Sequence, residues 1–236
     1  GVCLRDRNEA GAVLLGKLNM SEFAMGDAFE HPYGRPHNPW DLSRNAGTSS
    51  SGSSAATAAF LCATSLGEDT GGSIRGPASF CGLVGIRPSW GRVSRHGVLG
   101  ASWSMDQVGP ISRTVSDCAI TLAAIAGHDP RDATSAHREP TDYAATLGQD
   151  IKGLRLGVPE EYFVDGMDPG TRKAVEDAVS TLEGLGASVR HVSLPTTRYA
   201  LACYYIIAPS ECSANLARYD GVKYGYSSQD TTDLLA

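Results

Sequence analysis

Residues 154–194, LRLGVPEEYFVDGMDPGTRKAVEDAVSTLEGLGASVRHVSL, begin and end with segments typical of strands, at 154–158 and 188–194. Between these segments, Asp168 and the proline after it are typical of the start of a helix, and apolar residues recur at helical spacing as far as Leu185. A strand, a helix and a returning strand of these lengths predict a βαβ unit whose strands pair in parallel. We therefore expect an α/β fold with a mixed, largely parallel central sheet and helices on both faces.

Four other elements are predicted from the pattern of the remaining sequence. Residues 12–16, Ala-Val-Leu-Leu-Gly, are typical of a short buried strand, and residues 65–67 of a second one. Residues 53–63 have small side chains and favour a closely packed helix, while residues 114–126 form a helical pattern that starts on Thr114 and stops before a glycine. The predicted connections are an ordered loop with short helical turns at 20–45, a loop at 68–75 and a surface segment at 128–153.

Composition limits the classes of protein to which the chain can belong. Its 236 residues are 42% hydrophobic, with a net charge of −6 and no basic block, which argues against direct nucleic-acid binding. No apolar stretch has transmembrane length and no signal peptide opens the sequence, so no membrane association is expected. The cysteines are irregularly spaced, which favours buried free thiols in a cytoplasmic protein over disulfides or a zinc site. They are Cys3, Cys62, Cys81, Cys118, Cys203 and Cys212.

Two common catalytic motifs are set aside on the residues themselves. Residues 11–17 match the phosphate-binding pattern GxxxxGK, but Leu18 stands where the pattern needs a hydroxyl, and the residues between the glycines form a strand core. The G-x-S-x-G of a serine–histidine–aspartate hydrolase is missing. The histidines lie in polar or loop contexts, and His96 is the one best placed to act as an alternative base.

Two serine- and glycine-rich stretches are the candidate sites. A run such as residues 47–54, GTSSSGSS, is typical of a flexible linker, but a packed helix follows it without a break, so it lies within a domain. In residues 68–75, EDTGGSIR, two glycines before a serine leave room for a substrate. A plain tight turn is the common explanation of such a string, and an oxyanion hole is the functional one. The backbone amides that would form this hole are those of Thr70, Gly71, Gly72 and Ser73.

Taken together, the two stretches resemble the amidase signature family. Further matching segments are GKLNM at 16–20, NPW at 38–40, PASFCGLVG at 77–85, GRVS at 91–94 and DQVGP at 106–110. The resemblance covers essentially the whole chain and implies an amidase-signature fold with a Ser–cisSer–Lys mechanism. It implies that Ser73 is the nucleophile that forms the acyl-enzyme, and that Ser49, in a cis peptide, passes the proton to a buried neutral lysine.

The lysine of that mechanism is missing from the sequence. In the family it lies upstream of the Gly-Lys-x-Asn-Met segment, whereas Lys17 is the only lysine before Ser49 and belongs to that segment itself. Both ends of the chain also look cut, because Gly1 is not a methionine and no cap precedes Ala236. We therefore expect residues 1–236 to be an internal fragment of a single amidase-signature domain, without the N-terminal part that holds the lysine and without the C-terminal part. Such a fragment is expected to be inactive alone.

The second half of the chain resembles the A subunits of tRNA-dependent Asp/Glu amidotransferases. In that subfamily the subunit hydrolyses glutamine and passes ammonia to a partner subunit, which uses ATP and Mg²⁺ to activate mischarged tRNA. The resemblance thus implies glutamine as substrate, no cofactor in this chain, amidotransferase partner subunits and only indirect contact with tRNA. The substrate-binding residues it implies are Tyr204, Tyr205, Ser50, Asp69 and Arg75.

Several residues depart from that subfamily and leave other functions open. Thr48 and Ser51 replace glycines, Glu68 replaces a small or hydroxyl residue, and Gly76 stands where glutamine is usual. These departures make the first half similar to a stand-alone amidase or carbamate hydrolase, which is the second hypothesis. A non-catalytic scaffold is the third, because the general base is missing from the sequence.

Overall fold

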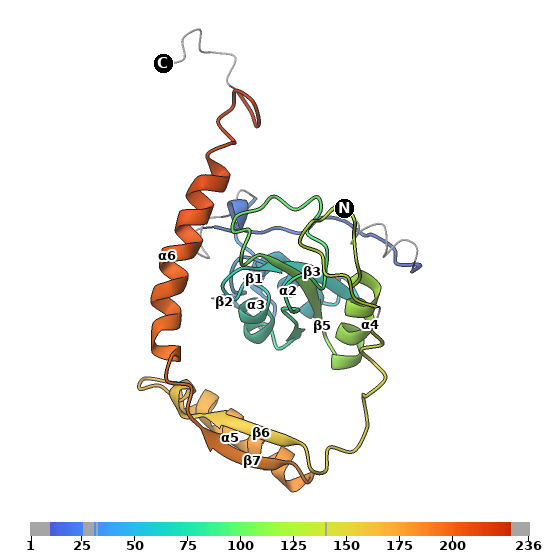
Figure 1. Cartoon of the computed structure of the whole chain (residues 1–236), viewed down its shortest axis with the longest axis vertical. Helices are drawn as coiled ribbons and strands as arrows, with labels where there is room; N and C mark the ends of the chain where they lie inside the picture. The colour runs from blue at the N-terminus through green and yellow to red at the C-terminus, as the bar shows by residue number, and fades with distance from the viewer. Residues whose placement is uncertain (1–9, 26–30, 32, 140, 228–236) are drawn as a thin grey trace. The chain divides into compact units, whose positions relative to one another are not determined.

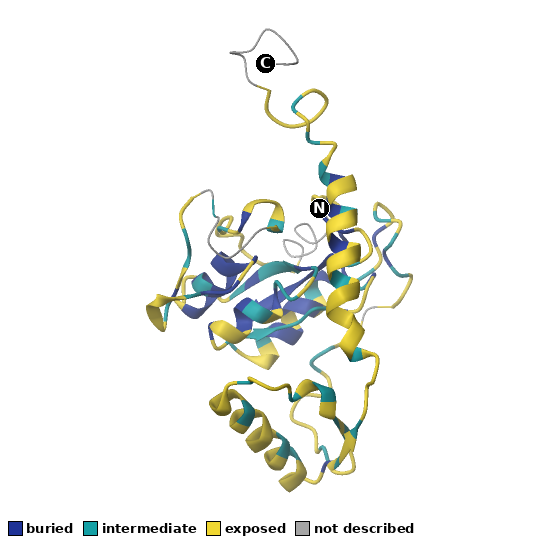
Figure 2. Ribbon diagram, turned by 90° about the vertical axis from the view of Figure 1, so that its left-hand side faces the viewer, coloured by how far each residue is buried: buried dark blue, intermediate teal, exposed yellow. Residues whose placement is uncertain are grey.

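The computed structural model describes residues 10–25, 31, 33–139 and 141–227 (Figure 1). The chain divides into two compact units, one of Gly1–Ala145 with Ala208–Ala236 and one of Thr146–Ile207. Figure 2 shows that the buried residues gather in the first unit, around its sheet. Within the described part of the chain, no helix is both long enough and apolar enough to cross a bilayer.

A three-stranded antiparallel sheet forms the centre of the first unit. Its strands lie in the order β3 (Thr64–Asp69), β5 (Gln107–Ser112) and β4 (Val84–Gly85). Ser65 pairs with Ile111, and Asp69 at the end of β3 pairs with Gln107 at the start of β5. All residues of β5 are buried, so this central strand is covered on both faces.

Helices cover both faces of this sheet. They are α2 (Ser51–Ala58), α3 (Arg75–Phe80) and α4 (Val115–Ile125). Alternate residues of a strand point to opposite faces, so Val108 and Ile111 belong to different faces of β5. Val108 packs against α4, whereas Ile111 packs against Ala78 of α3. Helix α2 lies on the same face as α3, because its Thr57 hydroxyl is 2.8 Å from the hydroxyl of Ser65.

The segment predicted as an ordered loop at 20–45 contains more regular structure than expected. A single turn of 3₁₀ helix, η1, spans Glu22–Ala24. Strands β1 (His37–Asn38) and β2 (Asp41–Asn45) then pair as an antiparallel hairpin. This hairpin leads directly into the serine-rich run, and the Asn45 side chain accepts a hydrogen bond from Gly47 N–H at 2.8 Å.

The second unit is built on the predicted βαβ motif. Strands β6 (Arg155–Pro159) and β7 (Ser188–Val192) pair in parallel, with α5 (Pro169–Gly184) between them. A short 3₁₀ turn, η2 (Glu160–Tyr162), follows β6, and the first part of α6 (Thr197–Leu216) follows β7. Asp168 caps α5 as expected, because its carboxylate accepts a hydrogen bond from Thr171 N–H at 2.8 Å.

Replacing the cap of α5, Asp168→Ala, is expected to lower the free energy of unfolding of the second unit by about 1 kcal/mol. The loss comes from an amide in the first turn of α5 that no longer has an acceptor. Denaturant unfolding followed by the circular dichroism of the full-length protein measures it. Asp165→Ala is the matched control, since Asp165 is also exposed and lies before the helix. Equal losses in the two variants would contradict the capping role.

The expected α/β class and the helices on both faces are confirmed, but the central sheet is corrected. The sheet of the first unit is antiparallel throughout, and β6 with β7 is the parallel pair of the described residues. The βαβ motif predicted parallel pairing of its own two strands, β6 and β7, and this prediction is confirmed. Strands β3 and β5 are linked instead through short helices and loops, without a crossover helix, so the chain returns antiparallel.

Two predicted elements differ in the structure. Residues 12–16 are not a buried strand, since Val13 is 83% exposed and no described strand pairs with them. An apolar run becomes a strand only where a neighbour accepts its backbone hydrogen bonds. The helix predicted at 53–63 is α2, which starts earlier because the serine-rich run forms its first turn. It ends by Ala58, and Phe60 has a left-handed φ of 61°.

The described cysteines are free thiols, as predicted. Cys81, Cys118 and Cys212 are buried, while Cys62 is half-buried and Cys203 is exposed, which corrects its predicted burial. Burial raises the pKa of the Cys81 thiol to about 11. Such thiols are unreactive at neutral pH. The remaining predicted thiol, at residue 3, lies outside the described residues.

Candidate active site

Ser49 stands immediately before helix α2, where the serine-rich run becomes helical. The peptide bond between Thr48 and Ser49 is cis, as the resemblance implied. The Ser49 side chain is 1% exposed, and its Oγ has no hydrogen-bond partner among the described residues. An unbonded buried hydroxyl typically costs about 1–3 kcal/mol. The Ser49 hydroxyl is therefore a candidate for a proton relay, which needs a hydroxyl that is not committed to the scaffold.

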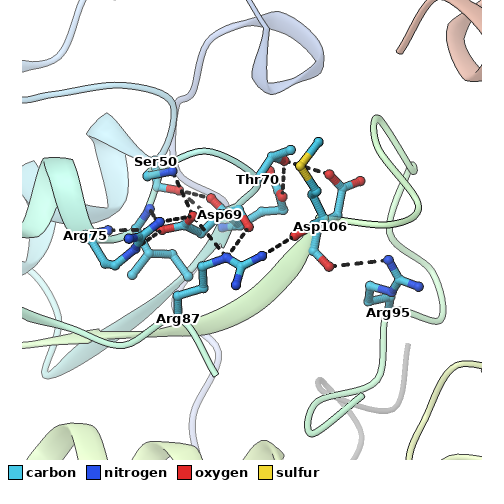
Figure 3. A network of polar contacts seen from close by, with 11 residues as sticks. Ser50, Asp69, Thr70, Arg75, Arg87, Arg95 and Asp106 are labelled. Carbon is cyan, nitrogen blue, oxygen red and sulfur yellow. Dashed lines mark hydrogen bonds and ion pairs between the residues drawn. The ribbon is translucent and has the colours of Figure 1, made fainter. Parts of the chain in front are cut away.

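The second stretch is organised by Asp69 at the end of β3. Its buried carboxylate accepts hydrogen bonds from the amides of Gly72 at 2.8 Å and Ile74 at 3.1 Å. The guanidinium of Arg75 donates two more, from Nε at 3.0 Å and Nη2 at 3.1 Å (Figure 3). Burial acts to raise the pKa of Asp69, but Arg75 and the Ile74 amide outweigh it and hold the pKa below its ordinary value. Asp69 thus fixes the Ser73 loop, residues 70–75.

The two serine stretches lie against each other. The Ser50 N–H donates a hydrogen bond to the carbonyl of Ser73 at 3.3 Å. The Ser50 hydroxyl accepts from the N–H of Glu68 and donates to its carbonyl, both at 3.2 Å. Gly67 leaves the space for this contact, because a Cβ there would lie 2.7 Å from Ser50 Oγ. Ser49 and Ser73 therefore belong to neighbouring loops on one side of the fold, as the predicted mechanism requires.

Helix α2 is held firmly along β3 beyond this contact. The Ser53 hydroxyl donates to the Leu66 carbonyl at 2.8 Å. At the other end of the helix, Nη1 of Arg113 donates to the carbonyl oxygens of Thr57 at 3.1 Å and Cys62 at 2.7 Å. Both ends of α2 are thus tied to the sheet, which makes the helix a rigid support for Ser49.

The amides of the Ser73 loop do not all remain available for a substrate oxygen. The N–H of Gly72, which has a φ of 135°, is bonded to Asp69. Gly72 therefore contributes its conformation and its hydrogen bond to the shape of the loop. Of the four amides predicted to form an oxyanion hole, those of Thr70, Gly71 and Ser73 remain the candidates.

A contact that the sequence did not predict joins the Ser73 loop to the residues before β5. Thr70 Oγ1 lies 2.8 Å from Glu68 Oε1 and 2.6 Å from Asp106 Oδ1. The other oxygen of Asp106 accepts the N–H groups of Ala101 and Ser102, each at 2.9 Å. The sequence contained one signal for this contact, the segment 106–110 that matched the family, but nothing in the pattern pairs Thr70 with Asp106.

The sequence of the chain matches a known protein family over almost its whole length. Residues 3–235 match the family described as Amidase. The chain belongs to the amidase family. This amidase chain is similar to the A subunits of glutamyl-tRNA(Gln) amidotransferases. It is 57% identical over 236 residues to that of Syntrophobacter fumaroxidans, covering 100% of the chain and 49% of that relative. It is 55% identical over 228 residues to that of Carboxydothermus hydrogenoformans, covering 96% of the chain and 47% of that relative.

Solved structures confirm the amidase-signature fold of the chain. The corresponding glutamyl-tRNA(Gln) amidotransferase chain of Thermotoga maritima superposes with a TM-score of 0.88 at 43% identity, over 91% of this amidase chain and 47% of that one. The native peptide amidase of Stenotrophomonas maltophilia superposes with a TM-score of 0.82 at 36% identity, over 94% and 47% of the two chains. The chain thus spans about half the length of the relatives it matches.

The residues predicted to bind substrate have varied surroundings in this amidase. The Asp69 side chain supports the Ser73 loop, and half-exposed Arg75 is its neighbour. The Ser50 side chain is bonded to the backbone of Glu68, which precedes the loop. Tyr204 and Tyr205 belong to α6 in the second unit, with ring centroids 5.2 Å apart in an edge-to-face arrangement. The substrate roles of all five residues stay predictions.

Proposed function

We propose that this chain carries the nucleophile and the relay serine of an amide hydrolase with a Ser–cisSer–Lys mechanism. One observation carries the proposal: a buried hydroxyl without a partner, Ser49 Oγ, stands beside the Ser73 loop, to which the Ser50–Ser73 hydrogen bond ties it. We further propose that the whole protein is the glutamine-hydrolysing subunit of a tRNA-dependent amidotransferase. The names and the 52–57% identity of the relatives support this part.

In the proposed reaction, Ser73 Oγ attacks the carboxamide carbon while its proton moves to Ser49 and on to a neutral lysine. The lysine comes from outside residues 1–236, and its burial lowers its pKa so that it accepts a proton near neutral pH. The amides of Thr70, Gly71 and Ser73 stabilise the oxygen as negative charge develops on it. The proton returns to the leaving nitrogen, ammonia departs, and water releases glutamate from the acyl-enzyme.

The proposed role fixes the partners as well as the substrate. Ammonia passes to a partner subunit that consumes ATP with Mg²⁺ and holds the tRNA, so this chain contacts tRNA only indirectly and needs no cofactor. The described free thiols support a reducing, cytoplasmic location, because disulfides form in oxidising compartments. A membrane has no part in the proposal.

A stand-alone amidase is the second candidate, and one observation favours it. Glu68 and Gly76 depart from the amidotransferase subfamily, and both flank the Ser73 loop. The superposition on a peptide amidase at 36% identity also supports this second candidate. The two candidates share the chemistry at Ser73 and differ in substrate.

Ammonia release by the full-length protein, alone and with its partner subunits, tests the proposal. We expect glutamine to be hydrolysed with a kcat/KM at least about tenfold above that of a C-terminally amidated peptide, a difference of about 1.4 kcal/mol in transition-state binding. The reverse preference would identify a stand-alone amidase, and no turnover of either substrate would leave a scaffold. Residues 1–236 alone should work at the background rate. Robust hydrolysis by them would assign the base to Lys17 or His96 and overturn the placement of the lysine.

A further inference from the structure

The hydroxyl of Thr70 lies between two carboxyl groups. Thr70 Oγ1 is 2.8 Å from Glu68 Oε1 and 2.6 Å from Asp106 Oδ1, both hydrogen-bond distances (Figure 3). A hydroxyl has a single proton and donates one such bond, while its lone pairs accept others. Each contact is a full two-centre hydrogen bond only if one of the two carboxyl groups carries a proton and donates it to Thr70.

The surroundings identify the protonated group as Glu68. Asp106 accepts the N–H groups of Ala101 and Ser102 on its second oxygen, and hydrogen bonds from backbone amides stabilise a carboxylate. Among the described residues, Thr70 is the one group that hydrogen-bonds to the Glu68 carboxyl. The proton therefore belongs to Glu68, which donates to Thr70, and Thr70 donates to Asp106.

We infer that Glu68 is a positioning residue of the proposed hydrolase: its neutral carboxyl group completes the chain Glu68–Thr70–Asp106 and so holds the Ser73 loop in place. Thr70 is the residue of that loop tied across the fold, and Asp69 anchors its other end through Gly72 and Ile74. Loss of the proton breaks one of the two Thr70 hydrogen bonds and sets two carboxylates around one hydroxyl. The inference rests on the proposed function for its effect on the rate, but not for the state of Glu68.

Charges around Glu68 act in the same direction as its geometry. Burial, followed by the negative charge of Asp106, raises the pKa of Glu68 to about 7, and Asp69 adds to the rise. The Thr70 hydroxyl and the positive charge of Arg87 act against it. Burial raises the pKa of the Cys212 thiol of α6, and the negative charges of Asp106 and Glu211 add to this rise. Glu211 accepts a hydrogen bond from the Ser102 hydroxyl.

The sign of the pH dependence follows from this raised pKa. Below the pKa of Glu68 in the unfolded chain, near 4.5, the group is neutral in both states and its contribution to folding is fully present. As pH rises through about 7, the folded protein loses the proton and the hydrogen-bond chain with it. The stability therefore falls between these two values, whereas the order of the Ser73 loop falls as pH rises through about 7.

Four variants of the full-length protein test the inference through the ratio of variant to wild-type kcat across pH. In Glu68→Gln the amide donates to Thr70 at every pH, so we expect a ratio near one at about pH 6 that rises about three- to tenfold by about pH 8.5. Thr70→Val should lower kcat and remove the dependence on Glu68, and Thr70→Ser should restore both. Glu183→Gln, on the exposed face of α5, is the matched control, with a ratio that stays at one.

A second readout separates this inference from the proposed function. Calorimetry should show that the Tm of the wild-type protein falls relative to that of Glu68→Gln between about pH 4.5 and 7, with no substrate present. A Tm difference that stays constant over this range would overturn the neutral state of Glu68. A changing Tm difference with a kcat ratio that is flat in pH would overturn the positioning role. Failure to hydrolyse glutamine would instead refute the proposed function and leave the calorimetric test intact.

Discussion

Full-length protein with Ser73→Ala is expected to form no acyl-enzyme and to release ammonia from glutamine at least about 10⁴-fold more slowly than the wild type. The change removes the proposed attacking oxygen and leaves the amides of the loop unchanged, so substrate binding should persist. The fold should also persist, because the loop contact to Ser50 uses the carbonyl of Ser73 and not its side chain. Single-turnover ammonia release, with mass spectrometry of the trapped acyl-enzyme, measures the effect.

Variants of two other serines belong to the same experiment, one at the proposed relay and one as a control. Ser49→Ala should slow the reaction by about 10²–10⁴-fold, since it removes the proposed proton relay but leaves the proposed nucleophile. Ser79→Ala is the matched control, because Ser79 is an exposed serine of the neighbouring helix α3 and should leave the rate unchanged. A Ser73→Ala protein that still acylates would exclude Ser73 as the nucleophile.

Asp69→Asn is expected to be the most damaging single change outside the two serines. The carboxylate of Asp69 is fully buried and is the shared acceptor for Gly72, Ile74 and Arg75. A hydrogen bond to a charged group typically contributes about 1.5–3 kcal/mol, and Asp69 accepts several at once. Because these same hydrogen bonds shape the Ser73 loop, kcat should fall together with the free energy of unfolding. Denaturant unfolding and ammonia release on the same preparation measure the two losses.

An exposed aspartate–arginine pair provides the control for that change. Asp41 and Arg44 are 3.2 Å apart on the surface, and Asp41→Asn should leave the free energy of unfolding nearly unchanged, because exposed ion pairs contribute little. The lowered pKa of Asp69 also fixes a pH dependence: its stabilisation is present above the ordinary pKa of an aspartate and is lost as pH falls below it. A stable and active Asp69→Asn protein would show that Arg75 and the amides do not depend on this carboxylate.

Local patterns predicted the parts of the fold that depend on neighbours in sequence. The βαβ motif and its cap at Asp168 were predicted because the spacing of apolar residues and the capping residue are both local. The prediction of a strand at residues 12–16 was wrong for the converse reason, since a strand needs a pairing partner that the local pattern does not reveal. The antiparallel pairing of β3 with β5 likewise depends on how distant segments meet.

The candidate site was likewise predictable from the sequence only in part. The two serine stretches, and the cis peptide at Ser49, were accessible through their resemblance to a family. The capture of the Gly72 amide by Asp69 was not, because it depends on the direction of one N–H bond in a folded loop. The contact of Thr70 with Asp106 joins residues 36 positions apart and has no periodic signature.

The hydroxyl groups of Ser50 and of Ser53 in α2 have a consequence for the edge of the sheet. Strand β3 is an edge of the described sheet, and an edge strand with open N–H and C=O groups is a template on which another chain can add a strand. Here Ser50 takes up both backbone groups of Glu68, and Ser53 takes up the carbonyl of Leu66. Serine side chains beside the site therefore also occupy three of the backbone groups that a second molecule would need in order to pair with this edge.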